Sequence, residues 1–198
     1  MGSQAGNQAE RAAGRPGHGA GAVAGALDSL PPAPRPVLPD VLAPGLRVVF
    51  VGSAAGAVSA ARGAYYAGPG NRFWPMLWET GLTPRLLAPG EFAELPRWGI
   101  GLTDLAKYES GADSALSRTA YDAAGLAARL RAAAPLVVAF NGRAPWRHFM
   151  ESEAGRGFVM ASGHAGCTMV ALPSTSGAAR RWWDPAPWHA LAARLRAA

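Results

Sequence analysis

Cysteine and lysine are almost absent from this 198-residue sequence, in which Cys167 and Lys107 are the only examples of each. A single thiol excludes an internal disulfide, a cysteine-built zinc site and a cysteine-ligated iron–sulfur cluster, so a reducing, cytosolic setting is expected. A single lysine leaves little scope for Schiff-base chemistry. The four histidines show no metal-ligand spacing, and neither a metal nor another cofactor is expected.

Long apolar stretches are missing as well. No run approaches the ~20 apolar residues that span a bilayer, so no membrane association is expected. Near the N-terminus, Glu10 and Arg11 interrupt the position where a signal peptide would need a continuous apolar segment. These absences together favour a cytoplasmic protein.

Acidic residues are outnumbered by basic ones, 13 against 19, and the net charge is +6. Residues 1–44 are neutral in sum, so the whole excess lies in residues 45–198. A basic, arginine-rich domain suits a phosphate-backbone partner, because positive charge attracts nucleic acid. Arginine is also the favoured basic residue of a composition rich in Ala and Gly, so charge alone does not decide the partner.

Residues 1–35 are dominated by Ala, Gly and Pro and have almost no large apolar side chains. Such a segment buries too little surface to offset the entropy of ordering, so we predict a disordered tail. Residues 36–198 are enough for one well-buried domain and short for two. We expect this domain to be a monomer.

Four short, nearly continuous apolar runs predict strands that are buried on both faces. They cover residues 46–52, 98–105, 135–142 and 167–174. Helical patterns cover residues 71–81, 121–135, 143–155 and 184–198, the last with Asp184 as N-cap and Pro185 after it. Strands that alternate with helices predict an α/β fold of three α/β/α layers around a central, mainly parallel four-stranded sheet.

Small or hydrogen-bonding residues follow each predicted strand. They are Gly52-Ser53-Ala54, Thr103-Asp104, Asn141-Gly142-Arg143 and Ser174-Thr175-Ser176-Gly177. Ligands of open parallel sheets bind beyond the carboxyl ends of the strands, so these residues predict a shared polar pocket. Taken singly, each has an ordinary alternative: Asp104 as a cap, Asn141 as a turn residue and the serines as a simple loop.

Known catalytic and phosphate-binding motifs are not matched at these strand ends. The first lacks both Gly-x-Gly-x-x-Gly and a Walker lysine, so it is a weak phosphate cradle. Ser53 is not in a Gly-x-Ser-x-Gly elbow. An α/β hydrolase with a Ser53, His164 and Asp104 triad stays open as an alternative, although no spacing supports it.

Four blocks, in order, resemble the uracil-DNA glycosylase superfamily, nearest to its mismatch-specific uracil/thymine branch. The blocks are FVGSAAG (50–56), YYAGPGNRFW (65–74), VVAFNGR (137–143) and LPSTSGAARRW (172–182). The resemblance implies a uracil-DNA glycosylase-like fold and a DNA-repair hydrolase of base excision repair. Such an enzyme flips uracil out of DNA and hydrolyses its N-glycosidic bond, because that bond is out of reach inside a duplex.

The resemblance also implies roles for individual residues. The base-binding group would be Gly52, Ala54, Tyr66, Asn71, Phe73 and Asn141. Tyr66 would stack on the flipped base, and the Asn141 amide would meet the edge of uracil. Asn71 would hold the loop, and Phe73 with Trp74 would be core residues of the next helix. Gly52 and Ser53 would offer backbone donors near the base oxygen that gains charge.

DNA-binding roles follow from the fourth block. Ser174, Thr175 and Ser176 would contact the phosphate backbone. Arg180 or Arg181 would fill the space left by the flipped base. The implied partner is uracil-containing DNA, single- or double-stranded, and the protein would be nucleoid-associated while it acts there.

The sequence departs from the family pattern at Ala54, where the first motif normally carries a polar residue, usually Asn. We expect Asp104 to replace it as the group that orients or deprotonates the attacking water, with Ser53 and then Asn71 as alternatives. Because Lys107 is the only amine candidate, a monofunctional enzyme that leaves an abasic site is expected. A catalytically inactive DNA- or uracil-binding member of the same fold is the alternative.

Overall fold

The computed structural model describes residues 34–162 and 167–197. The strands are β1 (Val48–Gly52), β2 (Ile100–Asp104), β3 (Val137–Asn141) and β4 (Thr168–Leu172). The α-helices are α2 (Ala57–Arg62), α3 (Phe73–Glu79), α4 (Ala123–Ala133), α5 (Arg143–Glu151), α6 (Glu153–Ser162) and α7 (Ala186–Ala197). The 3₁₀ segments are η1 (Pro89–Trp98), η2 (Asp113–Ala115), η3 (Arg118–Ala120) and η4 (Gly177–Trp182).

The strands form a four-stranded parallel sheet in the order β2-β1-β3-β4. Val48 of β1 lies opposite Ile100 on one side and Val137 on the other. Every residue of β1, β2 and β3 is buried, as expected for apolar runs covered on both faces. The same prediction is wrong for β4, an edge strand in which only Leu172 is buried. The predicted α/β architecture is confirmed, and each strand is shorter than its predicted run by two or three residues in total.

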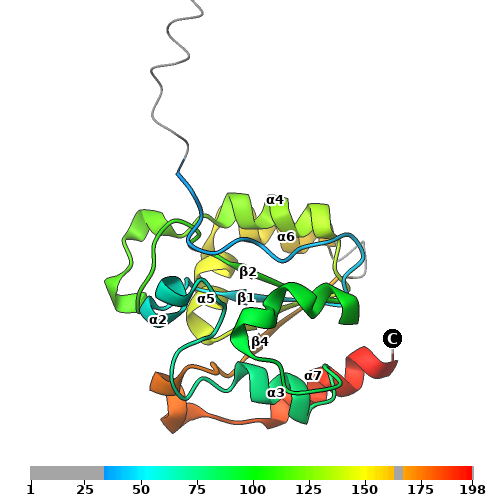
Figure 1. Ribbon diagram of the computed structural model, residues 1–198. Helices are drawn as coiled ribbons and strands as arrows, with labels where there is room; N and C mark the ends of the chain where they lie inside the picture. Colours follow the sequence, from blue (N-terminus) through cyan, green and yellow to red (C-terminus); the bar gives the residue numbers. More distant parts are fainter. Residues whose placement is uncertain (1–33, 163–166, 198) are drawn as a thin grey trace, which may run out of the picture. The chain divides into compact units, whose positions relative to one another are not determined.

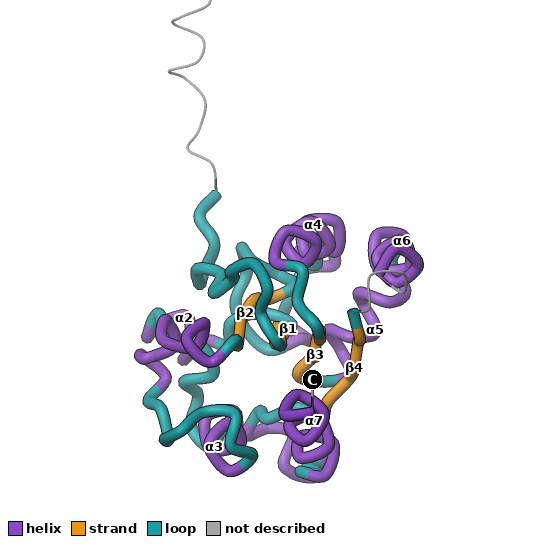
Figure 2. Tube along the Cα trace, turned by 90° about the vertical axis from the view of Figure 1, so that its right-hand side faces the viewer, coloured by secondary structure: helices purple, strands orange, loops and turns teal. Residues whose placement is uncertain are grey.

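Helices cover the sheet in two layers, with α4 and α6 on one side and α3 and α7 on the other (Figures 1 and 2). The alternation of side chains along β1 explains both layers. Phe50 belongs to the core cluster that contains residues of α3 and α7. Val49 and Val51 belong to the cluster that contains residues of α4, α5 and α6.

Three aromatic rings organise the core beneath β1. Trp188 of α7 stacks on Phe50 with ring centroids 5.3 Å apart, and Phe73 of α3 meets Phe50 edge-on at 5.3 Å. Burial of each large apolar side chain contributes roughly 1.5–3 kcal/mol. The Trp188 indole also donates a hydrogen bond to the Pro173 carbonyl (3.1 Å), which anchors the start of the loop that follows β4.

The segment before β1 runs along the outer edge of β2. Val41 pairs with Leu102 as an antiparallel bridge, and the Val37 amide donates to the Lys107 carbonyl (2.7 Å). An exposed strand edge is a site for unwanted pairing, so this segment protects the sheet. It also brings Leu38 to the end of the sheet where the strands finish.

One helical prediction needs correction. The pattern over residues 143–155 is not one helix, because α5 ends at Glu151 and α6 begins at Glu153. Ser152 causes the break: its backbone is extended and its hydroxyl accepts a hydrogen bond from the Gly155 amide (2.9 Å) as a new N-cap. The 3₁₀ segment η1, which contains Pro96, was not among the predicted elements.

The predicted disordered tail, residues 1–35, lies outside the described residues except for Pro34 and Arg35. Among the helices that the structure describes, none is long and apolar enough to cross a membrane.

Candidate active site

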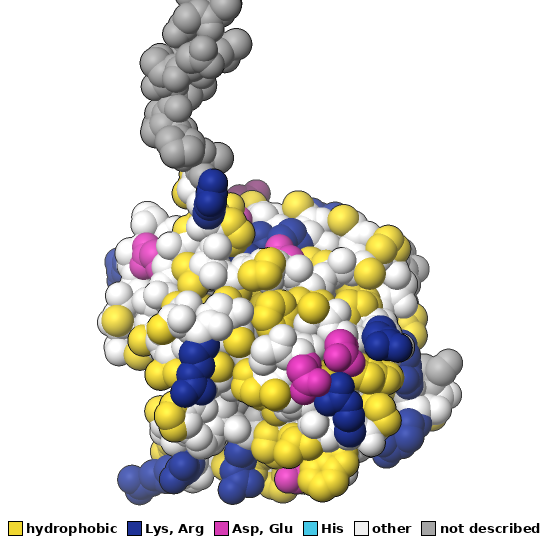
Figure 3. All heavy atoms as spheres, in the orientation of Figure 1, with side chains coloured by type: hydrophobic (Ala, Val, Ile, Leu, Met, Phe, Trp, Pro, Cys, Tyr) yellow, Lys and Arg dark blue, Asp and Glu magenta, His cyan; other side chains and the backbone are white. Residues whose placement is uncertain are grey.

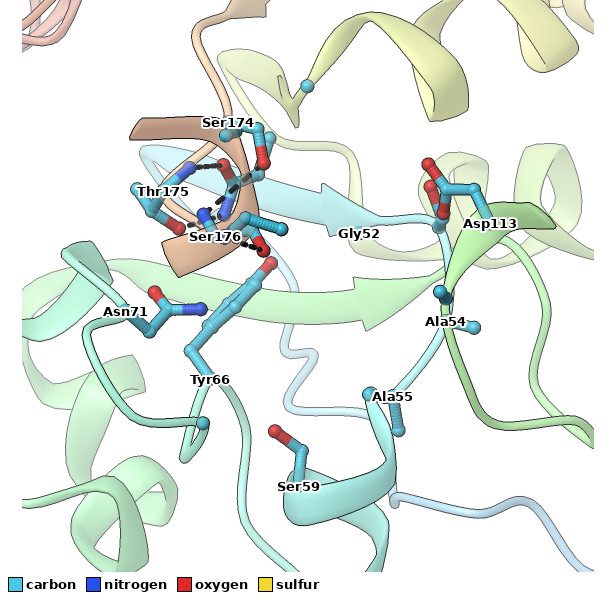
Figure 4. A pocket seen from close by; sticks show the side chains of 18 of the residues that line it. Gly52, Ala54, Ala55, Ser59, Tyr66, Asn71, Asp113, Ser174, Thr175 and Ser176 are labelled. Atoms are coloured by element: carbon cyan, nitrogen blue, oxygen red, sulfur yellow. Dashed lines mark hydrogen bonds between the residues drawn. The ribbon is translucent and has the colours of Figure 1, made fainter. Parts of the chain in front are cut away.

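The carboxyl ends of the parallel strands converge on a pocket of about 760 Å³. Of the predicted strand-end residues, all but Thr103 line it: Gly52, Ser53, Ala54, Asp104, Asn141, Gly142, Arg143, Ser174, Thr175, Ser176 and Gly177. Tyr66 and Asn71 line it from the loop between α2 and α3. Figure 4 shows the Tyr66 ring projecting into this space toward the loop that carries Ser174 and Ser176. Residues that are far apart in the sequence thus meet at one edge of the sheet.

Tyr66 is held in an unusual backbone conformation. Its φ of 53° is in the left-handed region, which large side chains rarely adopt and which costs about 1–3 kcal/mol. The ring stacks on Phe73 with centroids 4.0 Å apart and planes 28° apart. Asn71 supports the loop, because its side-chain oxygen accepts a hydrogen bond from the Phe73 amide (3.0 Å). The tyrosine ring is therefore placed in the pocket by packing behind it.

Phe73 does not have the pocket position that a base-binding residue requires. Its side chain is 0 % exposed and is not part of the pocket lining. The expectation that it belongs to the base-binding group is therefore corrected, while its expected place in the core is correct. Phe73 acts through Tyr66, which it supports from the core side.

Asp104 ends β2 and lies beside Gly52, the last residue of β1. The carboxyl side chain is only 3 % exposed, yet it lines the pocket. A Cβ atom on Gly52 would overlap the Asp104 carboxylate and lie 3.3 Å from the Tyr66 hydroxyl oxygen. Glycine is therefore required at residue 52 for the carboxylate and the tyrosine to approach each other.

Burial raises the pKa of Asp104 from its ordinary value of 3.8 to about 7. The charge of Lys107 opposes this shift, Asp40 adds to it and Arg129 opposes it. A carboxyl group that titrates near neutral pH can accept a proton from water and return it, which is what a general base requires. Ala54 thus has no polar side chain, but Asp104 at the end of β2 contributes a buried carboxylate to the same pocket.

The Tyr66 hydroxyl is buried and has no hydrogen-bond partner among the described residues. Burial raises the pKa of this phenol, and the nearby Asp104 adds to the rise. A buried hydroxyl without a partner costs about 1–3 kcal/mol, so it needs a partner that a ligand or water can supply. This orphan group lies beside the carboxylate at the base of the pocket.

Asn141 joins the end of β3 to the loop after β4 through two hydrogen bonds with Thr175. Its amide nitrogen donates to the Thr175 hydroxyl (2.8 Å), and its amide oxygen accepts from the Thr175 backbone amide (3.0 Å). Thr175 is 1 % exposed, and its carbonyl accepts from the Arg72 amide (2.9 Å). The Asn141 amide retains one N–H and one lone pair for a ligand. Thr175 ties the β4 loop to the domain and is too buried for the predicted phosphate contact.

Comparison with known proteins identifies the family of this chain. Residues 39–196 match the sequence profile of the uracil DNA glycosylase superfamily. The chain belongs to this superfamily. It is also similar to the solution NMR structure of a candidate uracil DNA glycosylase from Methanosarcina acetivorans, with 27 % identity and a TM-score of 0.56. That alignment covers 82 % of this chain and 98 % of the other.

In this member of the uracil-DNA glycosylase superfamily, the loop after β4 lines one side of the pocket. Ser174 is partly exposed and Ser176 is exposed, and the Ser174 hydroxyl accepts a hydrogen bond from the Ser176 amide (3.3 Å). Arg180 and Arg181 are exposed and lie on η4, outside the pocket lining itself. Basic side chains project from the lower edge of the face in Figure 3, where Figure 1 draws the segment after β4.

Trp182 is a further pocket residue, beyond those predicted from the sequence. Its side chain is 78 % exposed, although it lines the pocket, and the Arg181 guanidinium lies 5.7 Å from its ring centroid. The neighbouring Trp183 is partly buried and lies under Arg72 instead. The two adjacent tryptophans were a signal of exposed aromatic surface, but only the packing of η4 distinguishes the exposed ring from the buried one.

The two remaining candidate residues from the sequence are His164 and Lys107. His164 of the alternative hydrolase triad lies outside the described residues. Lys107 is 4 % exposed and ion-paired with Asp40 (2.7 Å). Among residues 34–162 and 167–197, no group of three His, Cys, Asp or Glu side chains is arranged to hold a metal ion.

Proposed function

We propose that this protein is a monofunctional uracil-DNA glycosylase, which hydrolyses the N-glycosidic bond of uracil in DNA and leaves an abasic site for base excision repair. The observation that carries the proposal is the buried Asp104 carboxyl group beside Tyr66, in a chain whose family acts on DNA. The mismatch-specific uracil/thymine branch is the part of the superfamily that we assign on the four sequence blocks.

Tyr66 provides the surface on which a flipped base stacks. Base–aromatic stacking contributes roughly 1–3 kcal/mol per base, and a ring that is already fixed loses little entropy on binding. Phe73 and the Phe50–Trp188 stack hold the ring from behind. The free N–H and lone pair of Asn141 are suited to the edge of uracil.

Asp104 is the general base in this proposal. Its carboxylate takes a proton from water as the water oxygen bonds to C1′ of the deoxyribose, and it stabilises the positive charge that forms on the sugar. The C1′–N1 bond breaks, and its electron pair leaves with the uracil ring. The backbone amides near Gly52 and Ser53 are the groups we assign to the charge on the uracil O2 atom.

Lys107 supports the monofunctional assignment. A lyase step requires a free amine that attacks C1′. The Lys107 ammonium donates to the Leu38 carbonyl (2.7 Å) and pairs with Asp40, so it is held as a charged, buried group. Ser174, Ser176, Arg180 and Arg181 are the side chains that we assign to the DNA backbone and to the space left by the base, in a monomeric enzyme.

The alternative is a member of the fold that binds DNA but does not cleave it, and Ala54 favours it because that side chain cannot orient water. An assay with a labelled uracil-containing oligonucleotide separates the two. Wild type is expected to form abasic sites, and Asp104→Asn is expected to lose ~10²- to 10⁴-fold in kcat while it still binds the oligonucleotide.

Glu79→Gln is the matched control, because it removes one exposed carboxylate on α3. Binding without any cleavage by wild type would favour the inactive alternative. Full activity of Asp104→Asn would instead refute the assignment of the base and leave Ser53 or Asn71.

A further inference from the structure

A network of charged side chains connects to Asp104. Asp40 joins two cations: one of its carboxylate oxygens lies 2.7 Å from the Lys107 ammonium, and the other lies 3.4 Å from the Arg129 Nε atom. Arg129 in turn donates a hydrogen bond from Nη2 to the Asp104 carbonyl (3.0 Å). The Thr103 hydroxyl, one residue before Asp104, donates to Asp40 (2.6 Å).

Separate parts of the chain build this network. Asp40 comes from the segment before β1, Lys107 from the loop after β2 and Arg129 from α4. The Lys107 ammonium also lies 3.4 Å from the Tyr65 hydroxyl, and that hydroxyl donates to the Pro39 carbonyl (3.0 Å). The Lys107 side chain is only 4 % exposed, so its ammonium group loses much hydration energy, and its charge favours the ionised form of Asp104.

We propose that Asp40, Lys107 and Arg129 are positioning residues that hold the Asp104 strand end in place and set the charge of its carboxyl group. This inference rests on the proposed function for the catalytic part, but the charge of Asp104 can be measured without catalysis. Asp40 has a balancing role, because it partly cancels the two cations that stabilise ionised Asp104.

Several charged or titratable groups face Asp104. The favourable ones are Lys107 and Arg129, and the unfavourable one is Asp40; the Tyr65 and Tyr66 hydroxyls are also close enough to interact with it. Burial raises the pKa of Asp104, and the two cations limit the rise. Removal of Asp40 should therefore favour the ionised carboxylate, and removal of Lys107 should disfavour it.

The experiment compares the pH dependence of kcat/KM for wild type, Asp40→Asn and Lys107→Met. Activity requires ionised Asp104, so wild type is expected to gain activity as the pH rises through about 7. Asp40→Asn should move the midpoint to lower pH and Lys107→Met to higher pH, each by about half a unit or more. Lys107→Arg keeps the positive charge, so it should have the wild-type midpoint. Glu79→Gln should leave the midpoint unchanged.

If Asp40 and Lys107 had only a structural role, their substitution would reduce activity at every pH. It would not shift the midpoint of the pH profile in opposite directions. Shifts in the same direction, or no shift in a folded Asp40→Asn protein, would overturn the proposal. If Lys107→Met does not fold, Asp40→Asn decides the result alone, since its amide oxygen still accepts from Thr103 and Lys107.

Carboxyl-carbon NMR titration of Asp104 in wild type and Asp40→Asn provides a second measurement. It should show the same displacement to lower pH even in a protein without glycosylase activity. A failure of the proposed function is therefore distinguishable from a failure of this inference.

Discussion

The base of the pocket and its mouth are built on different principles. At the base, Gly52, Asp104 and Tyr66 are held by the sheet, by the Phe73 stack and by close approach across two strands. At the mouth, Arg181 and Trp182 are exposed side chains on a short 3₁₀ segment. In the proposed function, the fixed, desolvated groups at the base are suited to the chemical step, whereas the exposed cations and rings at the mouth are suited to binding a long, charged substrate.

The largest expected effect at the base is on stability. Because burial raises the pKa of Asp104 from 3.8 to about 7, ionisation of this group costs the folded protein about 4 kcal/mol. A raised pKa stabilises the fold only at low pH, so this contribution is lost as the pH rises from about 4 through about 7. Asp104→Asn is therefore expected to unfold at higher urea concentration than wild type, by more at pH 8 than at pH 5.

Asp113→Asn provides the control for that measurement, since Asp113 is an exposed carboxylate on the pocket lining. It should change the urea midpoint little at either pH. If the difference in stability between wild type and Asp104→Asn were the same at pH 5 and at pH 8, the pKa of Asp104 in the folded protein would be ordinary. That result would contradict this prediction.

The next effect comes from Gly52→Ala. The new methyl group would overlap the Asp104 carboxylate, and displacement of a catalytic group by about 1 Å can cost ~100-fold in rate. Gly90→Ala is the matched control, because no atom lies within 4 Å of a Cβ placed there. Steady-state glycosylase kinetics should show the loss in kcat for Gly52→Ala alone, and equal rates for the two variants would contradict this geometry.

At the mouth, Trp182→Ala is expected to weaken binding of uracil-containing DNA by about tenfold, because a base-stacking ring contributes roughly 1–3 kcal/mol. Arg181→Ala should reduce the salt dependence of binding, with a slope that falls by about 1. Titration at several salt concentrations measures both effects. Single-turnover rates at saturating enzyme should stay at the wild-type value, and a loss of rate there would place the ring in the chemical step.

The smallest effect compares the two adjacent tyrosines. Tyr66→Phe removes a buried hydroxyl that has no partner in the described residues, so it should stabilise the fold by about 1 kcal/mol. Tyr65→Phe removes a hydroxyl that donates to the Pro39 carbonyl, so it should destabilise the fold by a similar amount. Thermal unfolding of the two variants should give melting shifts of opposite sign.

Most of the fold was readable from the sequence. The four apolar runs correspond to β1–β4, and β1, β2 and β3 are mainly apolar because they are buried on both faces. The helix starting after residue 142 was only partly correct, since one serine hydroxyl at Ser152 ends α5 and starts α6. The strand-end residues were also readable, because parallel strands all deliver their carboxyl ends to one edge.

The sequence alone therefore predicts the alternation of strands and helices, the edge of the sheet at which the site lies and the residue types at that edge. Tertiary structure alone decided which of those residues face the pocket. Phe73 lies behind Tyr66, Thr175 is tied to Asn141, and Trp182 rather than Trp183 is exposed. Tertiary structure also determines the pKa of Asp104. Its burial and its proximity to Asp40, Lys107 and Arg129 both depend on contacts between distant segments.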